Sequence, residues 1–475
     1  MLNNKIKGIS SLIAAVIIHL LMGNLFTFSN LLPYYRSYLY YENNETEVVS
    51  LKELYFVASI GIFAGNILPI FTGFLDKKVG TRLMTIMGTL LLLGSQLIFY
   101  FFIDFYLIII SYVIFGIAGS FTYLQVIRNC WKYFPGKEGL ISGIILCSFG
   151  LSTFIFTSIG DLIINKDGEP KVTQDFYSKE VAMKYLDYIF FYLICVIVMG
   201  SLSSILCFTY KEEKIGENIK KDEDEQNERD IDDKEDLVKK EEKKGDVYAT
   251  KLTLKESILS ADFFKCLTIA GCTLIFGFLL TNTYRSFGSQ KNLNEFWLQM
   301  LSKVFTMLNA FGRICWGFIF DKYGFTIPYI FVCINQLSWG IIIYFSSVHI
   351  VTYFIVVCFG VLSLAGHAIL FPNLMKIKFG NDNIVILLGI TGIFSGSACL
   401  MGPVLTLSFL GDSNVDLVRY LLVYLTGVAP TIISLILIFF IEAKYMKKTN
   451  RDNSDNKKIA VNTVSYEEGE NSMKE

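Results

Sequence analysis

Long apolar blocks alternate with short polar segments along the chain. The blocks without Asp, Glu, Lys or Arg cover residues 8–35, 54–75, 83–103, 105–127, 140–160, 188–210, 266–284, 325–375, 384–411 and 420–441. A bilayer core of about 30 Å is crossed by a helix of roughly 20 apolar residues, so each block predicts a membrane-spanning helix. The 325–375 block is long enough for two helices, and one further block is interrupted by Arg313. The pattern therefore predicts an all-α membrane protein with twelve transmembrane helices.

The composition agrees with a membrane protein, because 53% of the 475 residues are hydrophobic and only 18% are charged. The first apolar block is too long for a signal peptide and no cleavage pattern follows it, so we expect it to remain attached. The ten cysteines form no CxxC motif or Cys/His cluster. We therefore expect no metal and no cofactor. The formal net charge of −1 identifies no partner, and we expect no nucleic-acid partner.

One long polar segment divides the spans into two sets of six. Residues 211–258 contain the run KKDEDEQNERDIDDKEDLVKKEEKK, which cannot bury enough apolar surface to fold alone. We interpret this segment as a disordered linker between an N-terminal half, residues 1–210, and a C-terminal half, residues 259–446. Residues 447–475 are interpreted as a disordered tail.

The charges that flank the spans predict the orientation of the protein. With twelve spans, both termini and the linker lie on one side, and lysines cluster there, so that side is expected to be cytoplasmic. The predicted outer loop of residues 165–187 also carries lysines. The difference in positive charge between the two sides of the membrane is therefore smaller. A glycosylation pattern at Asn44 lies in a predicted outer loop. The plasma membrane is the expected location, and an internal membrane remains an alternative.

A short motif is repeated in the two halves. The stretch GFLDKKVGTR, residues 73–82, follows the second span, and GFIFDKYGFT, residues 317–326, follows the eighth. Each copy has two glycines seven residues apart around an Asp-Lys pair. Glycine allows the chain to reverse in a tight turn, and the aspartate can accept hydrogen bonds from a neighbouring helix end.

This repeat resembles the loop that follows the second span of each half in the major facilitator superfamily. The resemblance implies two pseudo-symmetric six-helix halves that rock about a central cavity. The first copy departs from the usual Gly-x-x-x-Asp spacing, because Asp76 stands one residue early, whereas Gly317 and Asp321 keep it. The expected gating residues are Gly73, Asp76, Gly80, Arg82, Gly317, Asp321 and Gly324.

Several further stretches resemble one branch of the superfamily, the oxalate/formate antiporters and their monocarboxylate-transporter relatives. They are GNLFTFSNLLPYYRSYL (23–39), WKYFPGKEGLISGIILCSFG (131–150), NTYRSFG (282–288), NAFGRICWG (309–317) and AGHAILFPNLMKIKFG (365–380). These matches touch both halves, whereas the linker and the tail match nothing.

Arg313 is the main candidate for a substrate-binding residue. An arginine near a helix centre costs about 2.5–3.5 kcal/mol on insertion scales, so we expect it to face the bundle interior or a cavity. Snorkelling toward the headgroups is the alternative. Asn309 lies four residues earlier on the same helix face, and a guanidinium is well suited to a carboxylate. The resemblance implies that an arginine of the eighth span engages the carboxylate substrate.

The charge of the substrate is suggested by a missing lysine. The family's second cation is expected in the eleventh span, where this sequence has Ser395. One buried positive charge matches a monocarboxylate, or a zwitterion whose amine is held elsewhere. Lys303 is about ten residues from Arg313, roughly 15 Å along the helix, and is expected near the outer mouth.

Coupling to protons would have to use histidine or the substrate itself, because the apolar blocks contain no Asp or Glu. His19 and His367 are the candidates, and we prefer His367 because the tenth span carries the family resemblance. Other polar residues can line the cavity, although each competes with the simpler interpretation of an interhelical hydrogen bond. They are Asn24, Thr27, Asn30, Tyr123, Gln125, Asn282, Tyr284, Ser395 and Ser397.

The sequence thus favours a monomeric secondary active transporter of a small organic anion, above all a monocarboxylate, working by alternating access with proton coupling or anion exchange. A neutral amino acid transporter of the same fold is the first alternative. A membrane nutrient receptor that binds without transport is the second. An enzyme is not expected, since no nucleophile, base and orienting group can be assembled from the spans.

Overall fold

The computed structural model describes residues 3–42, 51–102, 104–172, 176–211, 252–410 and 418–441. Within these ranges the chain forms helices and turns but no strand, which confirms the predicted all-α class. The expected glycosylation position Asn44, most of the linker and the tail lie outside the described residues.

The N-terminal half consists of helices joined by short connections. They are α1 (Asn4–Met22), the 3-10 turn η1 (Gly23–Phe26), α2 (Thr27–Glu42), α3 (Leu51–Ile67), α4 (Pro69–Val79), α5 (Thr81–Phe101), α6 (Phe105–Tyr133), α7 (Glu138–Ile164), α8 (Lys179–Met183) and α9 (Tyr185–Leu206). The first span is therefore interrupted near its middle by η1. The second span bends by 49° between α3 and α4, where Pro69 removes a backbone donor.

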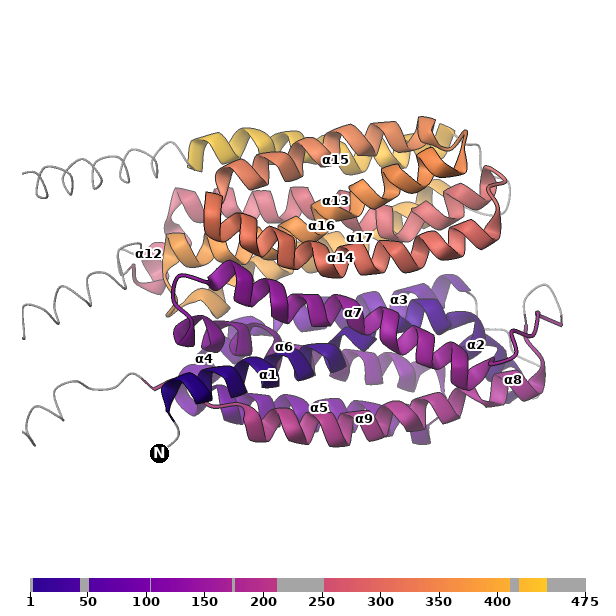
Figure 1. Ribbon diagram of the computed structural model, residues 1–475, viewed down its shortest axis with the longest axis horizontal. Coiled ribbons are helices and arrows are strands. Elements are labelled where there is room, and N and C mark those ends of the chain that lie inside the picture. The colour runs from indigo at the N-terminus through magenta and orange to yellow at the C-terminus, as the bar shows by residue number, and fades with distance from the viewer. Residues whose placement is uncertain are drawn as a thin grey trace, which may run out of the picture.

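The C-terminal half repeats this pattern with longer helices. They are α12 (Leu254–Leu259), α13 (Ala261–Gln290), α14 (Glu295–Tyr323), α15 (Thr326–Ser346), α16 (Ile350–Phe379), α17 (Ile384–Leu410) and a last helix, Val418–Ile441. Figure 1 shows the two halves as two layers of roughly parallel helices, indigo to magenta in one and pink to yellow in the other. Across the boundary α7 packs on α14, and α17 packs on α3 and α4.

The membrane-spanning helices match the predicted blocks with small shifts. Among the described residues, ten helices are long and apolar enough to cross a membrane, and the bent pair α3 and α4 adds an eleventh. The one remaining predicted span, the eighth in chain order, corresponds to α14, a 29-residue helix that carries Arg313. One expectation is wrong: α7 runs on through Asp161, so the fifth span does contain an acidic residue, to which Tyr34 donates a 3.4 Å hydrogen bond.

The linker ends earlier than its predicted boundary at residue 258. Thr253 caps α12 through a capping box, in which its amide donates to Glu256 at 2.8 Å and its hydroxyl accepts from the Glu256 amide at 3.3 Å. The end of the bundle where α1 begins and α12 lies is called the linker end below. The two repeated loops, between α4 and α5 and between α14 and α15, lie at this end.

Candidate functional site

Arg313 points from α14 into the N-terminal half. Its side chain is buried, with 7% of its surface exposed, and Nη1 donates a 2.7 Å hydrogen bond to the carbonyl of Leu146 in α7. Its Cζ atom lies 5.7 Å from the ring centroid of Phe149. The guanidinium is therefore held between the two halves, and the snorkelling alternative does not describe it.

No carboxylate neutralises this guanidinium within the described part of the chain. The ion pairs found there join other residues, such as Arg128 with Asp76 and Lys376 with Glu138. A buried charge without an ionic partner is expensive, and in a membrane protein such a group marks a functional site by default.

Two aromatic side chains complete the surroundings of Arg313. Tyr123 from α6 packs against Phe149 with ring centroids 5.2 Å apart, and His19 from α1 packs against Tyr123 at 4.8 Å. His19 also meets Phe149 edge-on at 6.3 Å. We call Arg313, Phe149, Tyr123 and His19 the Arg313 cluster. It unites α1, α6 and α7 of one half with α14 of the other.

Polar atoms without a partner gather in and beside this cluster. Arg313 Nε, His19 Nε2, Asn309 Oδ1 and Ser152 Oγ are all buried and have no hydrogen-bond partner among the described residues. Asn309 is one turn from Arg313 on α14, and Ser152 is one turn from Phe149 on α7. A buried polar atom left unpaired costs about 1–3 kcal/mol. Unpaired polar atoms on Arg313 and on the nearby His19 favour a polar ligand at this place.

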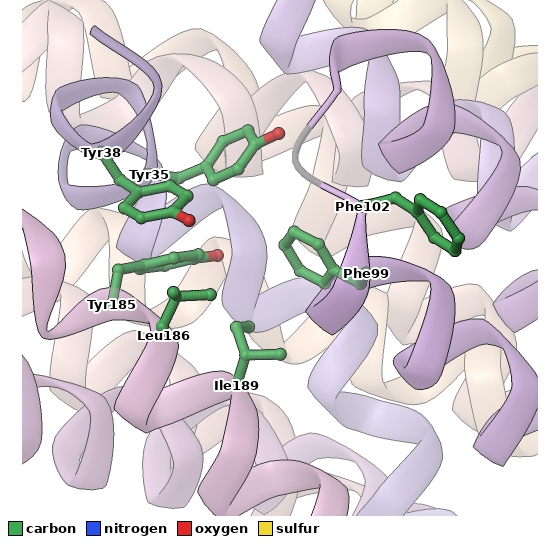
Figure 2. A pocket seen from close by; sticks show the side chains of 7 residues that line it. All are labelled: Tyr35, Tyr38, Phe99, Phe102, Tyr185, Leu186 and Ile189. Atoms are coloured by element: carbon green, nitrogen blue, oxygen red, sulfur yellow. The ribbon is translucent and has the colours of Figure 1, made fainter. Parts of the chain in front are cut away.

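Two of the predicted substrate-binding residues, Asn24 and Thr27, lie inside the N-terminal half and away from Arg313. Asn24 accepts a 2.9 Å hydrogen bond from the hydroxyl of Tyr188, and together with Thr27 it lines a cavity of about 10 Å³, room for roughly one water molecule. A neighbouring cavity of similar size is lined by aromatic rings, and Figure 2 shows Tyr38 and Tyr185 facing each other across it. Both cavities lie away from Arg313 and are too small for an organic acid.

The remaining predicted residues are scattered over the C-terminal half. His367 Nδ1 is 2.6 Å from the hydroxyl of Tyr329, inside a hydrogen-bonded group that includes Thr273. The hydroxyl of Ser395 donates to the carbonyl of Thr391 on its own helix at 3.2 Å. The side chain of Asn282 lies outside the described residues. Of the predicted residues whose side chains the structure describes, only Tyr123 and Asn309 accompany Arg313.

The second copy of the repeated motif joins the two halves at the linker end. The Asp321 carboxylate accepts 2.8 Å hydrogen bonds from the amides of Gly139 and Leu140, the second and third residues of α7. These amides are free donors at a helix N-terminus, where a negative charge is favoured. Gly317 also lies close to Gly139, because a Cβ atom at Gly317 would be 2.3 Å from the Gly139 carbonyl oxygen.

The first copy of the motif is arranged differently. Asp76 forms a 2.7 Å ion pair with Arg128 of α6 and accepts a 3.2 Å hydrogen bond from Thr81, so it serves its own half. The contact between halves comes instead from Lys77, whose Nζ donates to Asn383 Oδ1 at 2.6 Å. The early position of Asp76 in the motif therefore coincides with a changed role.

The other predicted gating residues shape these turns. Gly80 and Gly324 adopt φ values of +82° and +71°, which favour glycine. Gly73 lies against Ile386 of α17, and a Cβ atom there would be 2.7 Å from the Ile386 side chain. The Arg82 guanidinium lies over the ring of Phe208 at 5.7 Å.

The linker end is closed in this structure. Besides the contacts of Asp321 and Lys77, the Nζ of Lys376 is 2.6 Å from Glu138 Oε1. Like these contacts, the hydrogen bonds from the amides of Gly139 and Leu140 to Asp321 join the two halves at this end. The contacts of Asp321, Lys77 and Lys376 thus hold the two halves together on one side of the Arg313 cluster, and we call them the latches.

The sequence agrees with this architecture, because residues 12–403 match the sequence model of the Major Facilitator Superfamily. The chain belongs to this superfamily. It is therefore a multi-pass membrane transporter and not an enzyme. No curated protein matches the chain.

Solved structures of the superfamily have the same fold. FucP, a Major Facilitator Superfamily transporter in the outward conformation, has a TM-score of 0.64 and 12% identity, covering 92% of this chain and 99% of FucP. XylE, a proton:xylose symporter bound to 6-bromo-6-deoxy-D-glucose, has a TM-score of 0.59 and 12% identity, covering 90% of this chain and 95% of XylE. At this identity the likeness shows the fold alone.

Proposed function

We propose that this protein is a secondary active transporter of a small, singly charged organic acid, a monocarboxylate, and that Arg313 binds the carboxylate. The observation that carries the proposal is a buried guanidinium between the two halves with no carboxylate partner among the described residues. Its planar donors match a carboxylate in geometry and charge. A ligand anion would supply the missing negative charge.

The number of buried cations favours one carboxylate over two. Ser395 stands where the oxalate/formate antiporter branch has a lysine, and its hydroxyl is bonded within its own helix. A dicarboxylate at Arg313 would therefore bring one uncompensated negative charge into the membrane interior, which is costly. This supports the monocarboxylate-transporter side of the resemblance.

Alternating access is supported by the latches at the linker end. The lysines that flank the spans favour a cytoplasmic position for this end and for both termini. We also propose that the protein is a monomer at the plasma membrane. The structure then represents a state closed toward the cytoplasm. Opening would separate Asp321 from the N-terminus of α7 and expose the Arg313 cluster to the cytoplasm.

The coupling is proposed to be either proton symport or anion exchange. XylE is a proton:xylose symporter, but its 12% identity does not carry its sugar over to this chain. A neutral sugar would also leave the Arg313 charge uncompensated, whereas an acid would neutralise it. A neutral amino acid would place its carboxylate on Arg313 in the same way, so it remains the second candidate.

The test is uptake of labelled monocarboxylates into liposomes that contain the purified protein. We expect saturable uptake that Arg313→Ala abolishes and Arg313→Lys restores only weakly, since lysine lacks the bidentate geometry. Lys322→Ala is the matched control, because it removes an exposed cation from the same helix and should leave the maximal rate unchanged. Unchanged uptake by Arg313→Ala would remove the arginine from the mechanism.

A competition panel separates the substrate classes. Unlabelled monocarboxylates, dicarboxylates, neutral amino acids and xylose are added in excess to the same liposomes. We expect competition by molecules with a single carboxylate and none by xylose. Inhibition by xylose alone would overturn the proposal in favour of a sugar carrier. An imposed pH gradient that drives accumulation distinguishes proton symport from exchange.

A further inference from the structure

Two opposite charges lie on α7 and α14 at the outer end, the end of the bundle opposite the linker end. Asp161 is in the last turn of α7, and Lys303 is in the third turn of α14. The carboxylate of Asp161 accepts a 3.4 Å hydrogen bond from Tyr34. Lys303 is exposed and has no hydrogen-bond or ionic partner within the described part of the chain. Each half therefore brings one charged side chain to this end.

The packing of α7 on α14 places both charges on the facing sides of the two helices. The backbones touch at Gly150, where a Cβ atom would be 2.9 Å from Cα of Ala310. Asp161 follows Gly150 by 11 residues and Lys303 precedes Ala310 by seven. At 3.6 residues per turn these are about three and about two full turns, so each residue returns to the side of its helix that makes this contact.

The two side chains also lean toward each other along the helix axes. At 1.5 Å per residue, Asp161 lies about 16 Å beyond the contact at Gly150, and Lys303 lies about 10 Å beyond it. Side chains of a helix tilt toward its N-terminus. Asp161 therefore leans back toward the linker end, whereas Lys303 leans toward the outer end, and its flexible four-carbon stem covers the remaining offset. The charge of Lys303 already acts on the Asp161 carboxylate in this structure.

Asp161 and Lys303 do not form an ion pair while the linker end is closed. The ion pairs within the described ranges join other residues. The two halves of such a transporter rock against each other, so that opening at one end is accompanied by closing at the other. When Asp321 leaves the start of α7, the outer ends of α7 and α14 approach each other. The distance between Asp161 and Lys303 then becomes shorter.

We propose that Asp161 and Lys303 form an ion pair in the state that is open at the linker end, and that this pair is the outer latch of the transporter. The same two helices then carry a latch at each end. Asp321 of α14 holds the start of α7 in one state, and Asp161 of α7 holds Lys303 of α14 in the other. The pair does not depend on which molecule is transported, since it involves only these two helices.

The test measures the distance between spin labels on Lys166 and Phe296, which are exposed residues at the outer ends of opposite halves. The purified full-length protein carries Asp321→Asn, which favours opening of the linker end, and no substrate is added. We expect a population with a short label distance. Asp161→Asn and Lys303→Gln should each lower the ratio of short to long distances about threefold, as expected for a partly exposed ion pair.

Matched variants assign this effect to the pair. Asp187→Asn removes an exposed acid at the same end from α9, which packs on α1 and α5 of its own half, and should leave the distances unchanged. Asp161→Asn keeps an oxygen that can accept from Tyr34. Combining it with Lys303→Gln should cause no further loss, and Asp161→Lys with Lys303→Asp should restore the short distance. Independent losses, a charge reversal without recovery, or the absence of a short distance in every variant would overturn the outer latch. The carboxylate site at Arg313 would still stand.

Discussion

The amide of Gly139 in one half donates a 2.8 Å hydrogen bond to the carboxylate of Asp321 in the other half. The same carboxylate accepts from Leu140 at 2.8 Å, so it caps the N-terminus of α7 from across the molecular boundary. Asp76 holds the corresponding place in the first repeat but pairs with Arg128 of its own half. The two copies of the motif therefore have different mechanical roles.

Asp321→Asn should favour opening of the linker end. The amide keeps one acceptor oxygen but loses the charge that interacts with the start of α7. Because Asp321 is partly exposed, we expect the closed state to lose roughly 1 kcal/mol of stability relative to the open state. The ratio of open to closed molecules should then rise about fivefold. The distance between spin labels on the exposed residues Lys137 and Lys322 measures this shift. A distribution identical to that of the wild-type protein would contradict the assigned latch.

Asp76→Asn should reduce stability without opening the linker end. The Asp76 side chain is fully buried and that of Arg128 is 11% exposed, so the substitution leaves a buried cation unpaired. Removing one partner of such a pair costs about 3–5 kcal/mol. The thermal unfolding temperature of the purified protein should fall, and Arg128→Gln in the same background should restore part of it. An unfolding temperature that does not change would show that the ion pair contributes little.

The fold was largely predictable because the bilayer imposes a length on every apolar segment. Among the described residues, ten of the predicted spans are recovered as helical segments, the first of them interrupted by η1, and one more as a bent pair. All of them meet the same requirement for internal backbone hydrogen bonds. The bend before Pro69 and the extension of α7 through Asp161 were missed. The apolar pattern gives the length of a span but not its bend. A polar residue such as Asp161 in the last turn of a helix looks, in the sequence, like the start of a loop.

The site was predictable only where a charge marked it. Arg313 stands out in an apolar span, and the repeat pointed to Asp321 as a residue that accepts from a helix end, as it does here. Phe149 carries no such signal, although it lies inside a stretch that resembles the family. The sequence favours His367 over His19 because the tenth span carries the family resemblance, whereas only the structure shows His19 beside Phe149 and Tyr123. Pairings between distant helices are set by packing, which no local pattern records.

The ion pair between Glu138 and Lys376 should contribute modestly to the closed state. Their side chains are 22% and 19% exposed and the atoms are 2.6 Å apart, so solvent screens part of the attraction. We expect Glu138→Gln to lower the closed population about threefold, which corresponds to less than about 1 kcal/mol. The double variant Glu138→Lys with Lys376→Glu should recover part of the loss, as measured by the same label distances. If the double variant lowers the closed population by as much as the two single substitutions do together, the two side chains do not form a direct ion pair.

Gly317→Ala should prevent the linker end from closing. A Cβ atom at this position would lie 2.3 Å from the carbonyl oxygen of Gly139, closer than any real contact, and the obstacle is backbone that cannot rotate away. The helices α7 and α14 would have to separate, which disfavours the closed state and slows the transport cycle. Gly94→Ala is the matched control, because nothing lies within 4 Å of a Cβ atom there and the residue is also within a helix. Uptake into liposomes and label distances should change strongly for Gly317→Ala and little for Gly94→Ala. Equal effects of the two substitutions would indicate a general cost of adding a methyl group, and the close approach of the halves at Gly317 would then have no special part in gating.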